Sequence, residues 1–116
     1  MIKMNSDLIS ALSQKVKSSL TVDIVSFGEL RQLVRSDVEE ELVDKTVETV
    51  LDELLKSDVE IGQAFNVDGK YVKFVAWRGD GGDRVKRALI EVSNSAASDR
   101  EFAFWLCLKK NVDEYE

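Results

Sequence analysis

The chain has 116 residues with 22 acidic and 16 basic side chains, which gives a formal net charge of −6. It contains no histidine, so the usual neutral-pH general base and the commonest zinc ligand are missing. Its single cysteine, Cys107, cannot form an internal disulfide, which is typical of a reducing cytosol. The longest apolar run, residues 102–108, is far too short to cross a bilayer, and the N-terminus lacks the apolar core of a secretory signal. We expect a cytoplasmic single domain over residues 1–116 that is not an enzyme and holds no metal or cofactor.

The first part of the chain predicts two helices separated by a short strand. Apolar residues recur at helical spacing over 7–19, and the β-branched, alternating stretch 21–25 predicts a strand. Ser26 and Glu29 then match the S-x-x-E capping box, in which two side chains satisfy each other's free backbone N–H groups at the start of a helix. A second helix is therefore predicted to begin after Ser26.

A third helix, from Ser36 or Asp37 to about Lys56, is predicted to carry most of the negative charge. Residues 37–60 hold ten acidic and two basic side chains, a net −8, whereas the net charge is +2 over residues 1–36 and zero over 61–116. Apolar residues line one side of this helix, and the acidic residues fall mostly on the other. We expect these carboxylates to point outward without internal counter-ions. The candidate partner-binding carboxylates are Glu40, Glu41, Asp44, Glu48 and Asp52.

After the third helix the apolar period changes from about 3.6 to about 2 residues, which predicts a β-hairpin. Its strands are predicted over 59–66 and 70–78, joined by an Asp-Gly pair at 68–69 that favours a tight turn. Core packing is the ordinary role of the aromatic residues in this half of the chain. Tyr71 and Trp77, however, share the second face of the hairpin, and tyrosine and tryptophan dominate the energetic centres of protein interfaces. We therefore add Tyr71 and Trp77 to the candidate partner-binding residues.

The C-terminal third predicts further helices. Residues 79–83 form a glycine-rich connector, and helical spacing returns over 83–97. A second S-x-x-E capping box at 98–101 predicts a helix over 99–110, although the apolar run within it is also typical of a strand. Cys107 lies in that run and is expected to be a small, buried apolar residue without a catalytic role. The predicted fold class is α+β, with the order α-β-α-α-β-β followed by C-terminal helices.

This element order resembles the winged-helix version of the helix-turn-helix fold over residues 7–78. Residues 44–57 are similar in position to its recognition helix, and residues 59–61 to the start of its wing. The resemblance implies a DNA-binding transcriptional regulator. Nucleic-acid affinity depends, however, on Lys and Arg neutralising phosphates, and the acidic third helix would repel them. This alternative would need a basic surface from other elements, for which the candidates are Lys15, Lys17, Arg31, Arg35, Arg84, Lys86, Arg87 and Arg100.

Two interpretations of the acidic helix stay open. It is either a solvated face that keeps the protein soluble, or a docking surface for a positively charged protein. In size, charge, and histidine and cysteine content the chain resembles the small acidic immunity proteins of bacterial toxin–immunity systems, which cap basic nuclease toxins. That resemblance implies that the carboxylates from Glu40 to Asp52 would occupy the phosphate-binding groove of a toxin. The favoured hypothesis is a non-enzymatic module that binds a basic protein, with neither nucleic acid nor a membrane as its partner.

Overall fold

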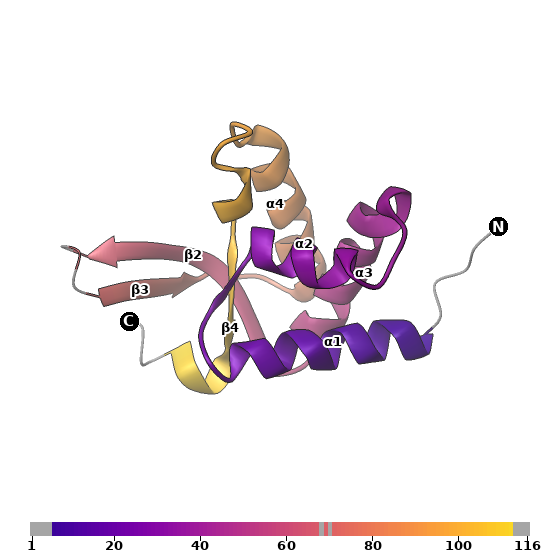
Figure 1. The fold of residues 1–116 in the computed structure, drawn as a ribbon. Helices are drawn as coiled ribbons and strands as arrows, with labels where there is room; N and C mark the ends of the chain where they lie inside the picture. Colours follow the sequence, from indigo (N-terminus) through magenta and orange to yellow (C-terminus); the bar gives the residue numbers. More distant parts are fainter. Residues whose placement is uncertain (1–5, 68, 70, 113–116) are drawn as a thin grey trace.

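Four α-helices and a four-stranded antiparallel sheet make up the computed structural model, which describes residues 6–67, 69 and 71–112 (Figure 1). Three helices, α1, α2 and α3, pack over one face of the sheet, and α4 packs beside α3. The α+β class predicted from the sequence is confirmed. The helices are α1 (Ser6–Leu20), α2 (Phe27–Arg35), α3 (Val43–Leu55) and α4 (Gly81–Asn94), with short 3₁₀ helices η1 (Glu40–Leu42), η2 (Arg100–Phe102) and η3 (Lys109–Asn111). The strands are β1 (Val25–Ser26), β2 (Val59–Val67), β3 (Tyr71–Ala76) and β4 (Trp105–Leu108).

The N-terminal elements follow the predicted order, but the first strand is much shorter than expected. The prediction of a strand over 21–25 is wrong for most of that range, because the backbone N–H of Thr21 still donates to the carbonyl of Lys17, 3.1 Å away, at the end of α1. The capping box of α2 is confirmed. Ser26 Oγ accepts a hydrogen bond from the backbone N–H of Glu29 at 3.2 Å, and the Glu29 carboxylate accepts one from the backbone N–H of Ser26 at 3.5 Å.

The acidic helix α3 begins later than predicted. Ser36 and Asp37, expected as its N-cap, instead complete the end of α2, where their backbone N–H groups donate to the carbonyls of Gln32 and Val34. The short helix η1 then leads into α3 at Val43. One side of α3 is packed in the core, as its apolar period predicts; the buried residues are Val43, Thr46, Val47, Val50, Leu51, Leu54 and Leu55.

The hairpin of β2 and β3 is confirmed and forms one end of the sheet. Its pairs run from Gly62 opposite Ala76 to Val67 opposite Tyr71. Gly69 has a φ of +69°, which suits the tight turn expected there, whereas Asp68 lies outside the described residues. Figure 1 shows the hairpin reaching out beyond the helices, so that its tip is farther from them than its base.

The predicted helix over 99–110 is wrong. Within this range only residues 100–102, as η2, and 109–110, at the start of η3, are in short 3₁₀ helices, whereas 105–108 form β4, which lies between β1 and β2 in the sheet order β1-β4-β2-β3. The expected capping box is not formed either, because Asp99 precedes η2 and makes no side-chain capping hydrogen bond. A short apolar run suits a strand that is covered on both faces. Leu106 is fully buried toward the helices and Cys107 is buried on the opposite face, so the predicted burial of Cys107 is confirmed. Because β4 separates β1 from the hairpin, the exact winged-helix order is not confirmed.

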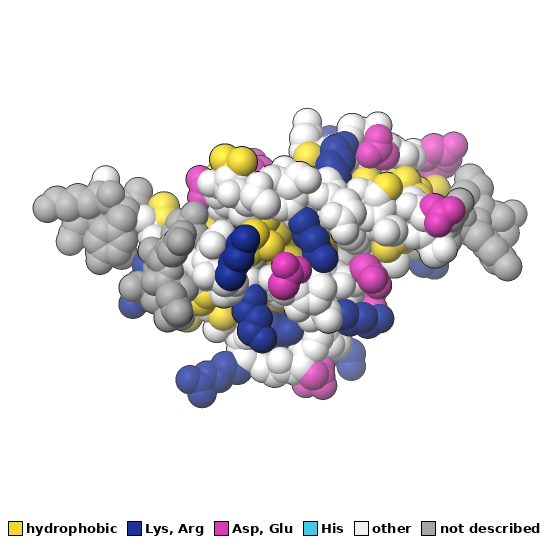
Figure 2. Space-filling view, turned by 90° about the horizontal axis from the view of Figure 1, so that it is seen from below, with side chains coloured by type: hydrophobic (Ala, Val, Ile, Leu, Met, Phe, Trp, Pro, Cys, Tyr) yellow, Lys and Arg dark blue, Asp and Glu magenta, His cyan; other side chains and the backbone are white. Residues whose placement is uncertain are grey.

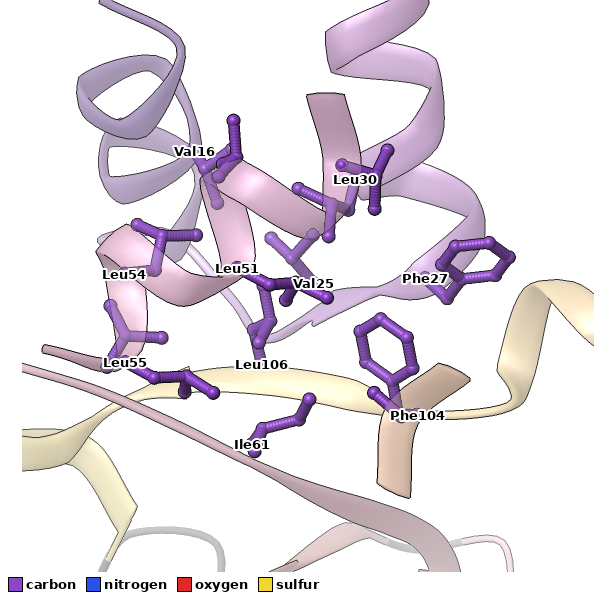
Figure 3. Packing of buried hydrophobic residues seen from close by; sticks show 14 of the residues in the cluster. Val16, Val25, Phe27, Leu30, Leu51, Leu54, Leu55, Ile61, Phe104 and Leu106 are labelled. Carbon is purple, nitrogen blue, oxygen red and sulfur yellow. The ribbon is translucent and has the colours of Figure 1, made fainter. Parts of the chain in front are cut away.

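The main core lies between the helices and the sheet. Figure 3 shows Leu51 of α3 pointing toward Leu106 of β4 and Ile61 of β2, and all three side chains are fully buried. At the other end of this core, the rings of Phe27 and Phe104 lie with their centroids 5.2 Å apart. Each large apolar side chain that leaves water contributes about 1.5–3 kcal/mol to stability. This packing fixes α3 against the sheet and leaves its acidic side at the surface.

Candidate protein-binding surface

Three of the five candidate carboxylates follow one side of α3. Asp44, Glu48 and Asp52 recur at four-residue intervals, so they form a single stripe along the helix. Glu40 and Glu41 lie in η1, directly before α3. All five are at the surface, with Asp52 partly buried, because the opposite side of α3 faces the core.

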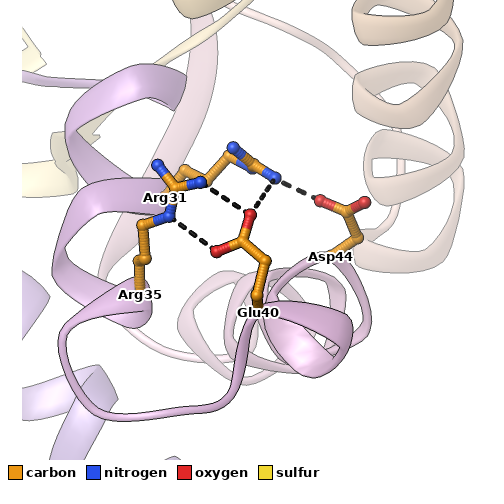
Figure 4. A network of polar contacts seen from close by, with 4 residues as sticks. All are labelled: Arg31, Arg35, Glu40 and Asp44. Carbon is orange, nitrogen blue, oxygen red and sulfur yellow. Dashed lines mark hydrogen bonds and ion pairs between the residues drawn. The ribbon is translucent and has the colours of Figure 1, made fainter.

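Two arginines of α2 hold part of this acidic surface. Arg35 donates two hydrogen bonds to the Glu40 carboxylate, from Nε at 2.8 Å and from Nη2 at 2.6 Å (Figure 4). Arg31 lies between two carboxylates, with Nε 3.3 Å from Asp44 Oδ1 and Nη2 3.9 Å from Glu40 Oε1. The hydrogen bonds from Arg35 hold the pKa of the Glu40 carboxyl below its ordinary value, and the same bonds raise the pKa of Arg35. The two arginines therefore neutralise Glu40 and Asp44 from within the chain.

Other carboxylates of the acidic segment are also paired. Asp52 forms an ion pair with Lys56, one helical turn farther along, with 3.2 Å between Asp52 Oδ2 and Lys56 Nζ. Asp58 is 3.4 Å from the ammonium of Lys17. The pKa of the Asp58 carboxyl is lowered, mainly by a hydrogen bond from its own backbone N–H and then by Lys17. These contacts correct the expectation that the acidic segment lacks internal counter-ions.

Two of the candidate carboxylates are available to bind a cation of a partner. Glu41 and Glu48 are exposed, and within the described part of the chain neither makes an ion pair. We call Glu41 and Glu48 the open acidic pair. Of the five carboxylates predicted from the sequence, these two can accept a partner's cation without first giving up an internal one.

A groove between α3 and α4, with a volume of about 360 Å³, borders Glu48. On the α4 side Leu89 lines it and is 38% exposed, which is high for a leucine beside a core. A basic side chain can cover Leu89 with its apolar stem while its charged end reaches Glu48, but Lys45 and Lys86 also line the groove, so only the edge at Glu48 suits a cation. The other residues that line the groove are Lys45, Thr49, Asp52, Gly82, Val85 and Lys86.

Trp77, one of the two aromatic candidates, is not an exposed anchor of the kind predicted. Trp77 is only 6% exposed and belongs to the main core, where its ring lies 6.5 Å from that of Phe104. The guanidinium of Arg87 covers the Trp77 ring at 4.3 Å from its centroid. The predicted exposure of Trp77 is therefore wrong, because this residue follows directly after β3 and its ring packs between Phe104 and the Arg87 side chain of α4. The side chain of Tyr71 lies outside the part of the chain that the structure describes.

Exposed apolar residues lie elsewhere on the hairpin and near it, and sequence reasoning did not select them. Phe65 is 52% exposed, Val72 39%, Val75 42% and Phe102 51%. The signal was present in the sequence, because both faces of the second strand are almost free of charge. The sequence could not show that the hairpin extends beyond the helices, where Phe65, Val72 and Val75 are exposed.

Most of the eight basic residues proposed for the DNA-binding alternative are paired with carboxylates of the same chain. Lys17 pairs with Asp58, Arg84 with Glu60 at 2.7 Å, and the two arginines of α2 with Glu40 and Asp44. Figure 2, seen from the side on which α1 lies, shows Lys and Arg side chains with Asp and Glu side chains among them. Of the eight basic candidates, Lys86 and Arg100 make no ion pair among the described residues.

No protein-family model, curated protein or solved structure matches this chain. Among the described residues, no group of three or more His, Cys, Asp or Glu side chains is arranged to hold a metal ion. No helix in residues 6–67 or 71–112 is both long and apolar enough to span a membrane.

Proposed function

We propose that the protein is a non-enzymatic module that binds a positively charged protein through the open acidic pair and the adjoining α3–α4 groove. One observation supports this proposal above others: Glu41 and Glu48 are exposed and form no ion pair with any described residue, whereas Glu40, Asp44 and Asp52 around them are held by arginine or lysine. A free carboxylate gains most from a partner's cation, because no existing contact has to be broken.

The paired carboxylates have a different role in this proposal. The side chains of Glu40 and Asp44 are still 60% and 86% exposed, so their charge can attract a positively charged partner at long range. A cation of the partner would, however, compete with Arg31 and Arg35 for direct contact. Glu40 and Asp44 therefore contribute to orienting the complex, and Glu41 and Glu48 to the contacts that hold it.

In its more specific form, the proposal makes the protein an immunity protein and the partner a basic nuclease toxin. The open acidic pair would then lie where the toxin holds the phosphates of its substrate. A positively charged groove that attracts phosphate also attracts carboxylates, and close charge pairs of this kind can give very tight complexes. The long-range attraction would raise the association rate and weaken with added salt.

The test is a charge reversal with a matched control. Glu41→Lys and Glu48→Lys each change the net charge by +2, as does the control Asp99→Lys at an exposed site outside α3. Each variant is used to capture partners from extracts of its natural source, and the recovered protein is then titrated against all variants at two salt concentrations. We expect the wild type and Asp99→Lys to bind alike, and Glu41→Lys and Glu48→Lys each to bind at least about tenfold more weakly.

Three results would count against the proposal or its specific form. Equal binding by all variants would remove the open acidic pair as the contact site. A recovered partner with an acidic surface would contradict the charge argument. A basic partner whose nuclease activity is unchanged in the complex would leave the binding module standing and overturn the immunity-protein form.

A further inference from the structure

The strand β3 offers an open edge for another strand. It is the last strand of the sheet, and β2 is the only described strand that pairs with it. It projects with β2 beyond the helices (Figure 1). Proteins usually protect such edges with charges, prolines or bulges, because a row of free backbone groups is a template for pairing. Here the chain has no proline, and Lys73 is the only charged residue within β3.

The register of the hairpin shows which backbone groups face that edge. Trp77 donates its backbone N–H to the carbonyl of Ile61 at 2.8 Å, directly after the last paired residues Ala76 and Gly62. Hydrogen-bonded and non-hydrogen-bonded pairs alternate along an antiparallel ladder. By that alternation Lys73 and Val75 bond to β2, so the backbone groups of Val72, Phe74 and Ala76 point to the open edge.

The two faces of β3 differ in their chemistry. The β3 residues on one face are apolar: Val72 is 39% exposed and lines a groove of about 680 Å³ together with Phe102 and Trp105, whose rings stack 5.7 Å apart. Asp23 and Glu29 also line this groove, and their charge disfavours acidic residues of an added strand on this face. The face of β3 that carries Val72 can therefore accept apolar side chains from an added strand.

The opposite face is positively charged around an apolar floor. Lys73 and Val75 lie on it, and a second groove of about 450 Å³ is lined by Phe65 and Val75 with the guanidinium groups of Arg78 and Arg87. The Arg87 guanidinium lies over the Trp77 ring, and its ion pair with Glu91 is long, at 3.9 Å. Lys73 and Arg78 make no ion pair among the described residues.

We infer that β3 binds an extended polypeptide segment in which acidic and apolar residues alternate. Side chains of a strand point alternately to its two faces, so an added strand would place its acidic residues beside Lys73, Arg78 and Arg87 and its apolar residues beside Val72. Main-chain hydrogen bonds to Val72, Phe74 and Ala76 would supply affinity, and the alternation would supply specificity.

A second copy of this chain suits the edge less well. Pairing two β3 strands about their middle would bring Lys73 of both copies close together, and like charges across a strand pair are destabilising. The cations near the end of the strand would add to that repulsion. The charge on this face therefore favours a partner of opposite sign.

Synthetic peptides test this inference on the full chain. Three capped eight-residue peptides are compared: alternating Glu and Val, alternating Lys and Val, and the Glu–Val peptide with its valine amides N-methylated, because the valines would lie opposite Val72, Phe74 and Ala76 and bond to them. Binding is measured at low salt by fluorescence anisotropy, and backbone hydrogen exchange of β3 is followed by NMR. Lys73→Glu is the test variant, and Lys110→Glu, at an exposed site in η3, has the same change in charge.

The Glu–Val peptide is expected to bind and to slow exchange at Val72, Phe74 and Ala76, whereas Lys73 and Val75 are already protected by β2. Lys73→Glu should weaken binding about fivefold, the size of one surface charge interaction, and Lys110→Glu should change it little. The N-methylated peptide should not bind. Equal binding of the Lys–Val peptide, unchanged exchange at the three edge amides, or protection of those amides by self-association instead of by the peptide would each overturn the inference.

Discussion

Arg31 and Arg35 determine which acidic side chains of this protein are available to a partner. They lie four residues apart in the last turns of α2, so both point from the same side of that helix toward η1 and the start of α3. The charge count of the acidic segment is correct as read from the sequence. Arg35 and Glu40 are 5 positions apart, and Arg31 and Asp44 are 13 positions apart. Whether they pair depends on the path of the chain from α2 into η1, and a count of charges does not predict that path.

The Arg35–Glu40 contact predicts a measurable titration. A carboxyl whose pKa is lowered in the folded state stabilises the protein above its unfolded-state pKa, and that contribution is lost as the pH falls below about 4 through the folded-state pKa. Arg35→Met should therefore move the Glu40 midpoint up toward the ordinary glutamate value in a carbon-detected NMR titration. Lys110→Met, with the same loss of one charge, should leave it in place. A Glu40 midpoint that is the same in both variants would show that the hydrogen bonds seen at 2.6 and 2.8 Å do not persist in solution.

Local sequence is a good guide to several elements and a poor one to others. The capping box at Ser26 depends on contacts within a few residues and forms as predicted, and Gly69 has the positive φ that the expected hairpin turn needs. The strand expected over 21–25 and the helix expected over 99–110 depend on neighbours far away in the chain. The apolar run after Phe102 becomes a strand because β1 and β2 stand on either side to receive its hydrogen bonds.

Gly62 is the position where the hairpin is most sensitive to substitution. A Cβ there would lie 2.0 Å from the carbonyl oxygen of Val75 and 2.8 Å from its carbonyl carbon, and neither backbone atom can move without breaking the pairing of β2 and β3. We expect Gly62→Ala to lower the free energy of unfolding by about 3 kcal/mol, the upper end for overpacking.

Gly69→Ala is the matched control for this substitution. A Cβ at Gly69 meets nothing within 4 Å, so only the positive φ of the turn opposes it, at a cost of about 1 kcal/mol. Urea unfolding measures both values. A smaller loss for Gly62→Ala than for Gly69→Ala would contradict the close approach of β3 to Gly62.

At the scale of the whole molecule, β4 joins the two ends of the fold. It pairs with β1 from the N-terminal half and with β2 from the hairpin, and Leu106 and Phe104 reach into the main core. Without β4 the sheet would split into a two-residue strand and an isolated hairpin, and neither is stable by itself in water. The helices would then lose the surface on which they pack.

A split chain tests this role of β4. Residues 1–99 alone should show little cooperative unfolding by far-UV circular dichroism, because the central strand is missing. Addition of a peptide with the sequence of residues 100–112 should restore it, while the same peptide with Leu106→Asp should not, since a buried charge would face the core. Cooperative unfolding of the fragment without any peptide would show that β4 is dispensable.

The amino-acid sequence alone was sufficient for the α+β class, the buried side of α3, the pairing of the two hairpin strands, and the burial of Cys107. Each of these follows from the spacing of apolar residues or from contacts between near neighbours. Only the tertiary structure showed which acidic side chains form ion pairs, that Trp77 is buried, and that β4 lies between β1 and β2. Ion pairs, cover over a strand and pairing within a sheet all join residues that are distant in sequence, and their energies exist only once packing has brought those residues within a few ångströms.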